Sequence, residues 1–251
     1  NHWARFSNIT VTGYMAANSV PEVVWVDDDW TGPDNCGGHV WQYDAFNKIQ
    51  DGIDAVAEGG TVNVAAGTYD LSEMGGPHWE PVSINKSLSL LGAGCTATIL
   101  DATGHTEHCD VIWVRGSEVH VEGLGICNGT FGIRINAPSG QHDLQIEDVA
   151  VYSCAATGIV FDGSGAVSDV SFENCSSNNN GTSGDGRGIY IGPGKAVANL
   201  ALVNTDCCGN TREGFHVQGT LTGLTITGGK FNDNTGTASY YGSGITLQTT
   251  T

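Results

Sequence analysis

The chain has 251 residues and carries 9 basic and 27 acidic side chains, a net charge of −18. This acidic field repels nucleic-acid backbones and anionic membrane surfaces, so we expect no nucleic-acid partner. No run of eighteen apolar residues occurs, so we expect no membrane span, and no linker-like segment divides the chain. The composition therefore predicts one folded domain.

The beginning of the chain is predicted to be an extension, residues 1–22, ahead of a β-helical domain over residues 23–251. Within it, residues 6–14 alternate apolar and polar side chains, which is typical of a strand. Two alternatives remain open for this strand: donation to a neighbouring subunit, or folding back along its own chain.

A single helix is predicted over residues 44–58. Apolar side chains between Phe46 and Val56 recur on one helical face, Asp44 suits the N-cap, and Gly59 suits the C-terminal stop. Placed before the first coil of strands, this helix would cover an otherwise open core and an unpaired strand edge.

A repeat organises the second half of the chain. Apolar-x-apolar segments begin 25, 26, 30 and 24 residues apart, at Val119, Leu144, Val170, Leu200 and Leu224. Each is followed by a Gly-apolar-x-apolar segment, beginning at Gly132, Gly158, Gly188, Gly214 and Gly244. Such alternation is typical of strands that bury one face, and the repeat length without a helix predicts an all-β solenoid, a parallel β-helix.

One polar position also recurs in successive coils and is occupied by Cys154, Asn180, Asn210 and Asn234. Stacked asparagine side chains hydrogen-bond to one another along the axis of a solenoid. The repeat therefore predicts an asparagine ladder.

The first half shows the same alternation less regularly, at residues 61–64, 82–84, 88–90 and 98–100. It also contains the segments Ile49–Ile53, Gly59–Val64, Ala66–Tyr69, Asn85–Gly92 and Thr98–Asp101. These segments resemble the opening of secreted right-handed parallel β-helix proteins of the pectin-lyase-like superfamily. At the level of the fold, the resemblance covers residues 23–247. It implies a right-handed β-helix with an N-terminal α-helical cap and an extracellular or cell-surface location. That superfamily includes polysaccharide lyases, glycosidases, epimerases and non-catalytic surface proteins, so the fold does not name the function.

The outward-facing positions of the glycine-led strands carry candidate catalytic residues, because these positions stack from coil to coil. They include Arg134, Tyr190 and His216, while Arg187 and Glu213 stand just before two of the glycines. A lyase or epimerase acting on a uronic acid needs a cation for the carboxylate, a base for the C5 proton and an acid for the leaving oxygen. Those five residues are the candidates for such roles. A polar surface without catalysis is the alternative.

An acidic column suggests a metal site. Glu122, Glu147 and Glu173 occupy the same position in three successive coils, with Asp148 beside Glu147 and His120 on the strand of Glu122. Carboxylates about 5 Å apart repel one another unless they share a cation. Calcium accepts flexible all-oxygen shells, so Ca²⁺ is the expected ion, and a solvated acidic stripe is the alternative.

The eight cysteines fit no zinc-binding spacing. Cys127 and Cys154 occupy nearby positions in neighbouring coils, as do Cys175 and Cys207, which predicts two disulfides; buried free thiols are the alternative. Five Asn-X-Ser/Thr sequons are candidates for glycosylation: Asn8, Asn85, Asn128, Asn174 and Asn180.

The charge-poor surface favours a non-catalytic extracellular β-helix, such as a filament, sheath or cell-envelope subunit. The expected partners are further copies of the chain or a further C-terminal domain, because the last coil ends at Leu247 without a cap and leaves a strand edge. The alternatives are a polysaccharide lyase or epimerase and a carbohydrate-binding adhesin without turnover. Since no signal-type segment follows Asn1, the chain is interpreted as a processed mature chain or a fragment.

Overall fold

The computed structural model describes residues 19–71, 82–105, 108–136, 139–183, 186–237 and 240–248. The strand expected over residues 6–14 and the sequon at Asn8 lie outside these ranges. Within the described ranges, no helix is long and apolar enough to cross a membrane.

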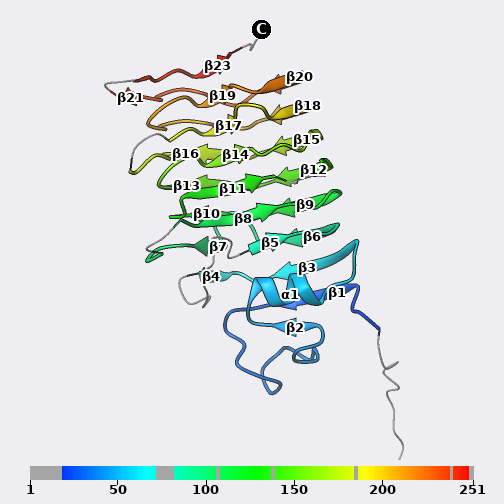
Figure 1. Cartoon of the computed structure of the whole chain (residues 1–251). Helices are drawn as coiled ribbons and strands as arrows, with labels where there is room; N and C mark the ends of the chain where they lie inside the picture. Colours follow the sequence, from blue (N-terminus) through cyan, green and yellow to red (C-terminus); the bar gives the residue numbers. More distant parts are fainter. Residues whose placement is uncertain are drawn as a thin grey trace, which may run out of the picture.

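The chain winds as a parallel β-solenoid in which three sheets run along the axis (Figure 1). In the described residues, sheet A has nine strands in the order β2 (Ala45–Phe46), β1 (Val23–Val26), β3 (Gly60–Val64), β6 (Leu88–Leu91), β9 (Val119–Glu122), β12 (Gln141–Glu147), β15 (Val167–Glu173), β18 (Ala196–Val203) and β20 (Thr220–Thr227). Sheet B has five, in the order β16 (Ser176–Asn178), β13 (Ala150–Tyr152), β10 (Gly125–Cys127), β7 (Thr98–Asp101) and β4 (Gly67–Asp70).

Sheet C completes the coil with seven strands among the described residues. Their order is β23 (Ile245–Leu247), β19 (Phe215–Val217), β17 (Ile189–Ile191), β14 (Ile159–Phe161), β11 (Phe131–Ile135), β8 (Asp110–Val114) and β5 (Val82–Ile84). A short antiparallel pair is formed by β21 (Gly236–Thr237) and β22 (Tyr240–Tyr241). The parallel β-helix predicted from the repeat is confirmed.

The core is a set of internal columns of apolar side chains. Ile133, Ile159, Ile189 and Phe215 stand in register on neighbouring strands of sheet C, and all four are fully buried. Ile245 continues the same register in the last coil but is partly exposed. The column forms because alternate strand positions face inward and each coil removes the apolar surface of its neighbour from water.

The helix is shorter than predicted. α1 spans Ile49–Ala55 with Lys48 at the N-cap, and it follows β1 and β2 in the chain. Asp44 accepts a hydrogen bond from the Val40 backbone N–H instead of capping the helix. Residues 45–46 pair with β1, so strand pairing replaces the first predicted helical turn. α1 packs against β1, β2, β3 and β5, and its role as a cap of the solenoid stays a prediction.

The asparagine ladder is confirmed on the connection from sheet B to sheet C. Asn180 donates Nδ2–H to Asn210 Oδ1 at 3.0 Å, and Asn210 donates Nδ2–H to Asn234 Oδ1 at 3.1 Å. Asn180 Oδ1 in turn accepts the Cys154 backbone N–H at 3.1 Å. Because Asn180 is buried in this ladder, its sequon is not accessible in the folded chain. This corrects the glycosylation prediction at Asn180.

The other described sequons lie on the surface. Asn85 and Asn174 are exposed. Asn128 is exposed too, and its Nδ2 donates to Asp101 Oδ1 at 2.7 Å and to Thr103 Oγ1 at 2.8 Å. Glycosylation at these three positions stays a prediction.

All eight cysteines are free thiols, so the two predicted disulfides are absent from the structure. Cys127 pairs with Tyr152, so Cys154 stands two residues beyond the position opposite Cys127. The Ser176↔Asp206 bridge gives Cys175 and Cys207 the same offset. Two residues along a strand and one strand across separate Cα atoms by about 8 Å, too far for a disulfide. The alternative, buried thiols, describes both pairs.

Candidate functional site

The outer face of sheet C brings most of the predicted catalytic residues together. Arg134, Val160, Tyr190 and His216 stand in register on β11, β14, β17 and β19. Arg187 and Glu213 lie in the turns before β17 and β19, next to Tyr190 and His216. Arg134 belongs to a separate cluster two strands away from Tyr190.

A buried charge network lies on this face between β17 and β19. Arg187 Nε donates to Glu213 Oε2 at 2.9 Å and shares its hydrogen with His216 Nδ1 at 3.0 Å. Arg212 Nη2 lies 3.4 Å from Glu213 Oε1. Arg187, Arg212, Glu213 and His216 are each exposed by 9% or less. One buried carboxylate therefore holds two arginines.

Burial sets the protonation of this network. Burial lowers the pKa of His216, the Glu213 carboxylate opposes this, and the Arg187 cation adds to it. Since Nδ1 accepts a hydrogen bond from Arg187, the neutral ring carries its proton on Nε2. Burial also lowers the pKa of Arg187, in the same direction as the neighbouring charge of Arg212.

Tyr190 is the half-buried member of the group and connects it to solvent. The guanidinium carbon of Arg187 lies 4.3 Å from the centre of its ring, and the His216 ring is 5.4 Å away. The Tyr190 hydroxyl donates to Gln218 Oε1 at 2.6 Å. Burial raises the pKa of Tyr190, while Arg187 and Arg212 oppose the rise. A phenol beside a guanidinium is suited to proton transfer.

Arg134 is held between two carboxylates. Its Nε and Nη2 donate to Asp162 at 3.0 and 2.7 Å, and its Nη1 donates to Asp110 Oδ2 at 2.9 Å. Asp110 is fully buried, and His108 Nε2 lies 2.8 Å from its other oxygen. Burial lowers the pKa of Arg134, but the hydrogen bonds to Asp162 and Asp110 outweigh this and raise it.

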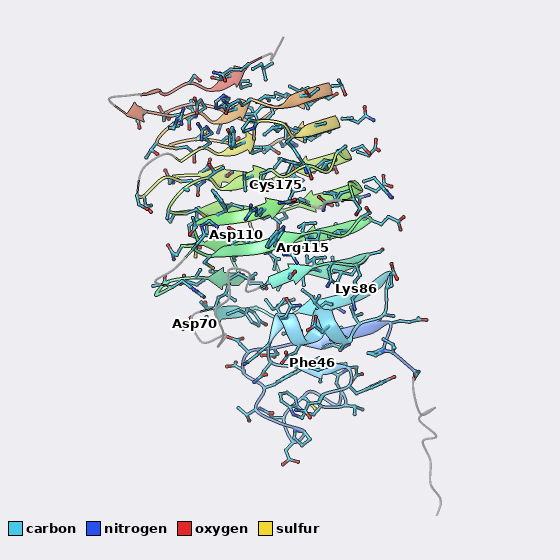
Figure 2. All side chains as sticks on the ribbon, viewed as in Figure 1. Phe46, Asp70, Lys86, Asp110, Arg115 and Cys175 are labelled. Carbon is cyan, nitrogen blue, oxygen red and sulfur yellow. The ribbon has the colours of Figure 1, made fainter. Side chains whose placement is uncertain are left out.

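Sequence reasoning missed the aromatic part of this face. Trp113 stands beside Arg134 in register, and Arg115 and Arg134 lie 3.6 and 4.9 Å from the centre of its ring. Figure 2 labels Asp110 and Arg115 on the middle coils. The alternation of Trp113 and Arg115 around the inward-facing Val114 indicates that both side chains face outward. Their alignment with Arg134 was not predictable, because the repeat is irregular in the first half of the chain.

Positive charge is concentrated on this face although the chain is acidic overall. All four arginines of the described residues lie on or beside sheet C: Arg115 after β8, Arg134 on β11, Arg187 before β17 and Arg212 before β19. Lys195 follows β17; burial lowers its pKa and the charge of Asp162 opposes this. Arg187, Arg212 and Lys195 are buried, whereas Trp113, Arg115 and Arg134 are half-buried. The groups that the face offers to an anionic ligand are therefore Trp113, Arg115 and Arg134.

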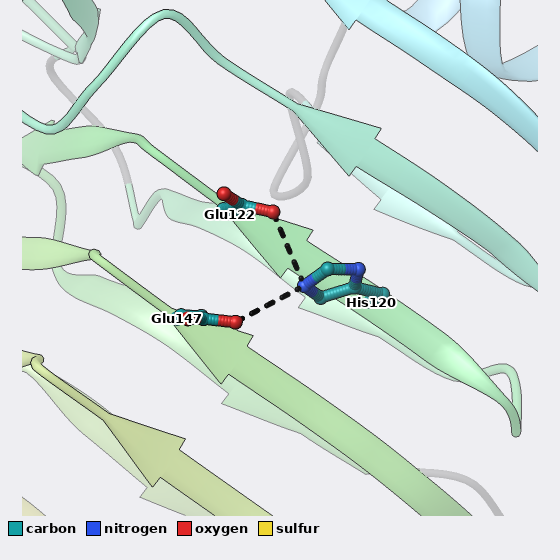
Figure 3. Close-up of side chains that lie close together, drawn as sticks. All are labelled: His120, Glu122 and Glu147. Carbon is teal, nitrogen blue, oxygen red and sulfur yellow. Dashed lines mark ion pairs between the residues drawn. The ribbon is translucent and has the colours of Figure 1, made fainter.

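The predicted metal site is only partly assembled. His120, Glu122 and Glu147 lie together on the outer face of sheet A (Figure 3). Glu173 continues the register on β15 but lies outside this group. Asp148 turns away at the corner with φ 47°, and its Oδ1 accepts from Cys95 Sγ at 3.3 Å. The structure therefore groups two of the four predicted carboxylates with His120.

No family model matches the chain, and no curated protein matches it. Among solved structures, an alginate lyase from Paenibacillus sp. str. FPU-7 has a TM-score of 0.65 and 19% identity, over 78% of this chain and 68% of that chain. Geobacillus virus E2 ORF18 has a TM-score of 0.58 and 21% identity, and the match covers 73% of this chain and 38% of that chain. Pectate lyase Pel9A has a TM-score of 0.55 and 14% identity, and the match covers 80% of this chain and 56% of that chain. The chain thus shares the parallel β-helix fold with these structures.

Proposed function

We propose that the chain is an extracellular polysaccharide lyase that binds an anionic, uronate-containing polysaccharide along the outer face of sheet C. The observation that carries the proposal is the gathering of all four described arginines on or beside one face of a chain with a net charge of −18. The shared fold with an alginate lyase and a pectate lyase supports the same class of reaction.

The reaction is a β-elimination. The C5–H bond of a uronate breaks, a C4=C5 double bond forms, the C4–O4 bond breaks, and a proton ends on the leaving oxygen. A cation must stabilise the charge that develops on the uronate carboxylate. A cation and the proton-transfer group must therefore face the same polymer. On the outer face of sheet C the half-buried cations are Arg115 and Arg134, and Tyr190 lies two strands from Arg134.

Tyr190 is the proton-transfer residue of this proposal. Its hydroxyl is held by Gln218, and the Arg187 guanidinium over its ring opposes the rise in the Tyr190 pKa that burial causes. Arg187 and His216 are positioning residues, because both are buried and do not reach a polymer on the surface. This changes the direct acid and base roles expected for them from the sequence.

The proposed binding face extends beyond Tyr190. Trp113 on β8 is three strands away from Tyr190 on β17, which is about 14 Å along the axis. A polymer aligned with the solenoid axis would contact Trp113 and Arg115 with one sugar while another faces Tyr190. Sugar rings stack on aromatic faces, and their carboxylates pair with guanidinium groups.

The test is a panel of uronate polymers, in which the ultraviolet absorbance of the unsaturated product reports elimination. We expect turnover of at least one polymer by the unaltered chain and a loss of about 10²–10⁴-fold in Tyr190→Phe. Tyr152→Phe is the matched control, since Tyr152 lies on sheet B, and it should keep full activity. Unchanged turnover in Tyr190→Phe, or no product from any polymer, would overturn the proposal.

A second candidate is a non-catalytic module that forms filaments or a cell-envelope layer, or that binds carbohydrate without turnover. This candidate is favoured because the arginines already form ion pairs within the chain. Arg134 pairs with Asp110 and Asp162, and Arg187 pairs with Glu213. Retention of the chain on an immobilised uronate polymer without any unsaturated product would support the adhesin, and ordered assemblies of the full chain in electron micrographs would support the structural role.

A further inference from the structure

We propose that His120, Glu122 and Glu147 form a binding site for one divalent transition-metal ion of the Zn²⁺ class. The site lies on the outer face of sheet A and is independent of the polysaccharide face on sheet C. Its donors are one imidazole nitrogen and two carboxylates.

The backbone fixes the three donors on two adjacent strands. His120 and Glu122 are two residues apart on β9, so their side chains project from the same face of the sheet. Glu147 on β12 stands directly opposite Glu122 in the register. Both strands lie in the interior of the nine-stranded sheet A, so the framework of the site is rigid.

The distances between donors suit a metal better than they suit hydrogen bonds. His120 Nε2 lies 3.5 Å from Glu122 Oε2 and 3.9 Å from Glu147 Oε2, and the three donor atoms lie within 4.8 Å of one another. Metal–nitrogen and metal–oxygen bonds of about 2.1 Å in a tetrahedral shell place neighbouring donors about 3.4 Å apart. The observed separations are close to that value. Small rotations of the two glutamate side chains, each almost half exposed, would bring the donor atoms to the required distance.

Two further features of the cluster favour binding of a cation. The His120 side chain is 29% exposed, but its Nε2 atom is inaccessible to solvent and has no hydrogen-bond partner among the described residues, and it points toward both carboxylates (Figure 3). Glu122 and Glu147 place like charges directly opposite each other on neighbouring strands, which is destabilising. A divalent cation between the three groups accepts the lone pair of the nitrogen and neutralises the repulsion.

The donor set decides the class of metal. Ca²⁺ prefers six to eight oxygen ligands, whereas an imidazole with carboxylates is typical of Zn²⁺ and neighbouring transition metals. This changes the expectation of calcium, which rested on four carboxylates. Three protein ligands leave at least one coordination position for water.

The test is calorimetric titration of the metal-free chain with Zn²⁺ and, separately, with Ca²⁺. We expect one Zn²⁺ site that is weakened at least about tenfold in His120→Gln and in Glu147→Gln. Glu173→Gln is the matched control, because Glu173 belongs to the same column but lies outside the cluster, and it should bind like the unaltered chain. Two variants are used so that a folding defect in one does not decide the result.

Cobalt substitution separates this site from the free thiols. Co²⁺ bound by His120, Glu122 and Glu147 should show ligand-field bands without the charge-transfer band of a cobalt–thiolate bond. Equal Zn²⁺ affinity in the unaltered chain and in both variants would overturn the proposal, as would a thiolate band for the tight site. Ca²⁺ binding that is tighter than Zn²⁺ binding and is lost in Glu147→Gln would overturn the assignment to a transition metal.

Discussion

Arg187 Nε and Glu213 Oε2 form a buried ion pair of 2.9 Å that joins the turns before β17 and β19. Arg212 lies against the other oxygen of the same carboxylate. Among the described residues, Glu213 is therefore the acidic side chain that pairs with two buried arginines and lies beside a histidine.

Replacing Glu213 should destabilise the chain. Glu213→Gln removes the carboxylate that pairs with the buried Arg187, and removal of one partner of a buried pair costs about 3–5 kcal/mol. Urea unfolding followed by circular dichroism measures this change in the free energy of unfolding. The exposed Glu173→Gln should stay within about 0.5 kcal/mol of the unaltered chain. Equal stabilities of the two variants would contradict the prediction.

Stability should fall below neutral pH because of His216. Burial lowers the pKa of His216 in the folded chain, so the unfolded chain binds more protons as pH falls through the ordinary histidine value of about 6.5. The folded state then loses up to about 1.4 kcal/mol per pH unit, until pH passes the folded pKa. Above the unfolded pKa the contribution is complete.

The measurement for His216 compares unfolding free energies between pH 7.5 and pH 5. His216→Asn should show a shallower decline than the unaltered chain. His142→Asn, which removes an exposed histidine, should decline in parallel with the unaltered chain. The groups that act on His216 include Arg187, Glu213 and Tyr190, together with Arg212 and Gln248. A decline that is unchanged in His216→Asn would assign the pH dependence to other groups.

The asparagine ladder should be a local source of stability. In Asn210→Ala, the buried Asn180 backbone N–H loses its acceptor, which costs about 1–3 kcal/mol. Thermal unfolding of Asn210→Ala and of Gln145→Ala, an exposed amide on sheet A, measures the difference. If the ladder does not stabilise the fold, the two variants should have the same midpoint temperature of unfolding.

The cysteines should titrate as eight free thiols after unfolding. In the folded chain, burial raises the pKa of Cys127 to about 11 and that of Cys154 to about 12, so almost no thiolate forms there at pH 8. Cys208 is only partly buried and should react first with Ellman's reagent. Cys208→Ser should remove the fast phase, and fewer than eight thiols after unfolding would show that disulfides form.

In the regular second half of the chain, the sequence predicted which side chains stack in the same internal column. The period-two alternation placed Ile133, Ile159 and Ile189 in one internal column because a one-residue shift would turn every apolar side chain outward. The same register correctly grouped Tyr190 and His216. Their depth was not predictable, since burial of an outward-facing side chain depends on the turns that fold over it.

The errors have a common cause. The disulfide prediction assigned Cys175 and Cys207 to nearby positions in neighbouring coils, but an offset of two residues between the coils separates them. The helix prediction used a local pattern over residues 44–58, but pairing with β1 held its first residues extended. The clamp of Arg134 by Asp110 and Asp162 joins three coils and leaves no local pattern.

The amino-acid sequence by itself determined the solenoid, its internal columns and its asparagine ladder, because these repeat with the coil and are specified by alternation and turn residues within each repeat. Only the tertiary structure decided that the arginines gather on sheet C, that Glu213 is buried between two of them, and that His120 points between Glu122 and Glu147. Those contacts depend on side-chain direction and on the exact stagger between coils. Both are settled by packing across the axis, which no local segment of the chain encodes.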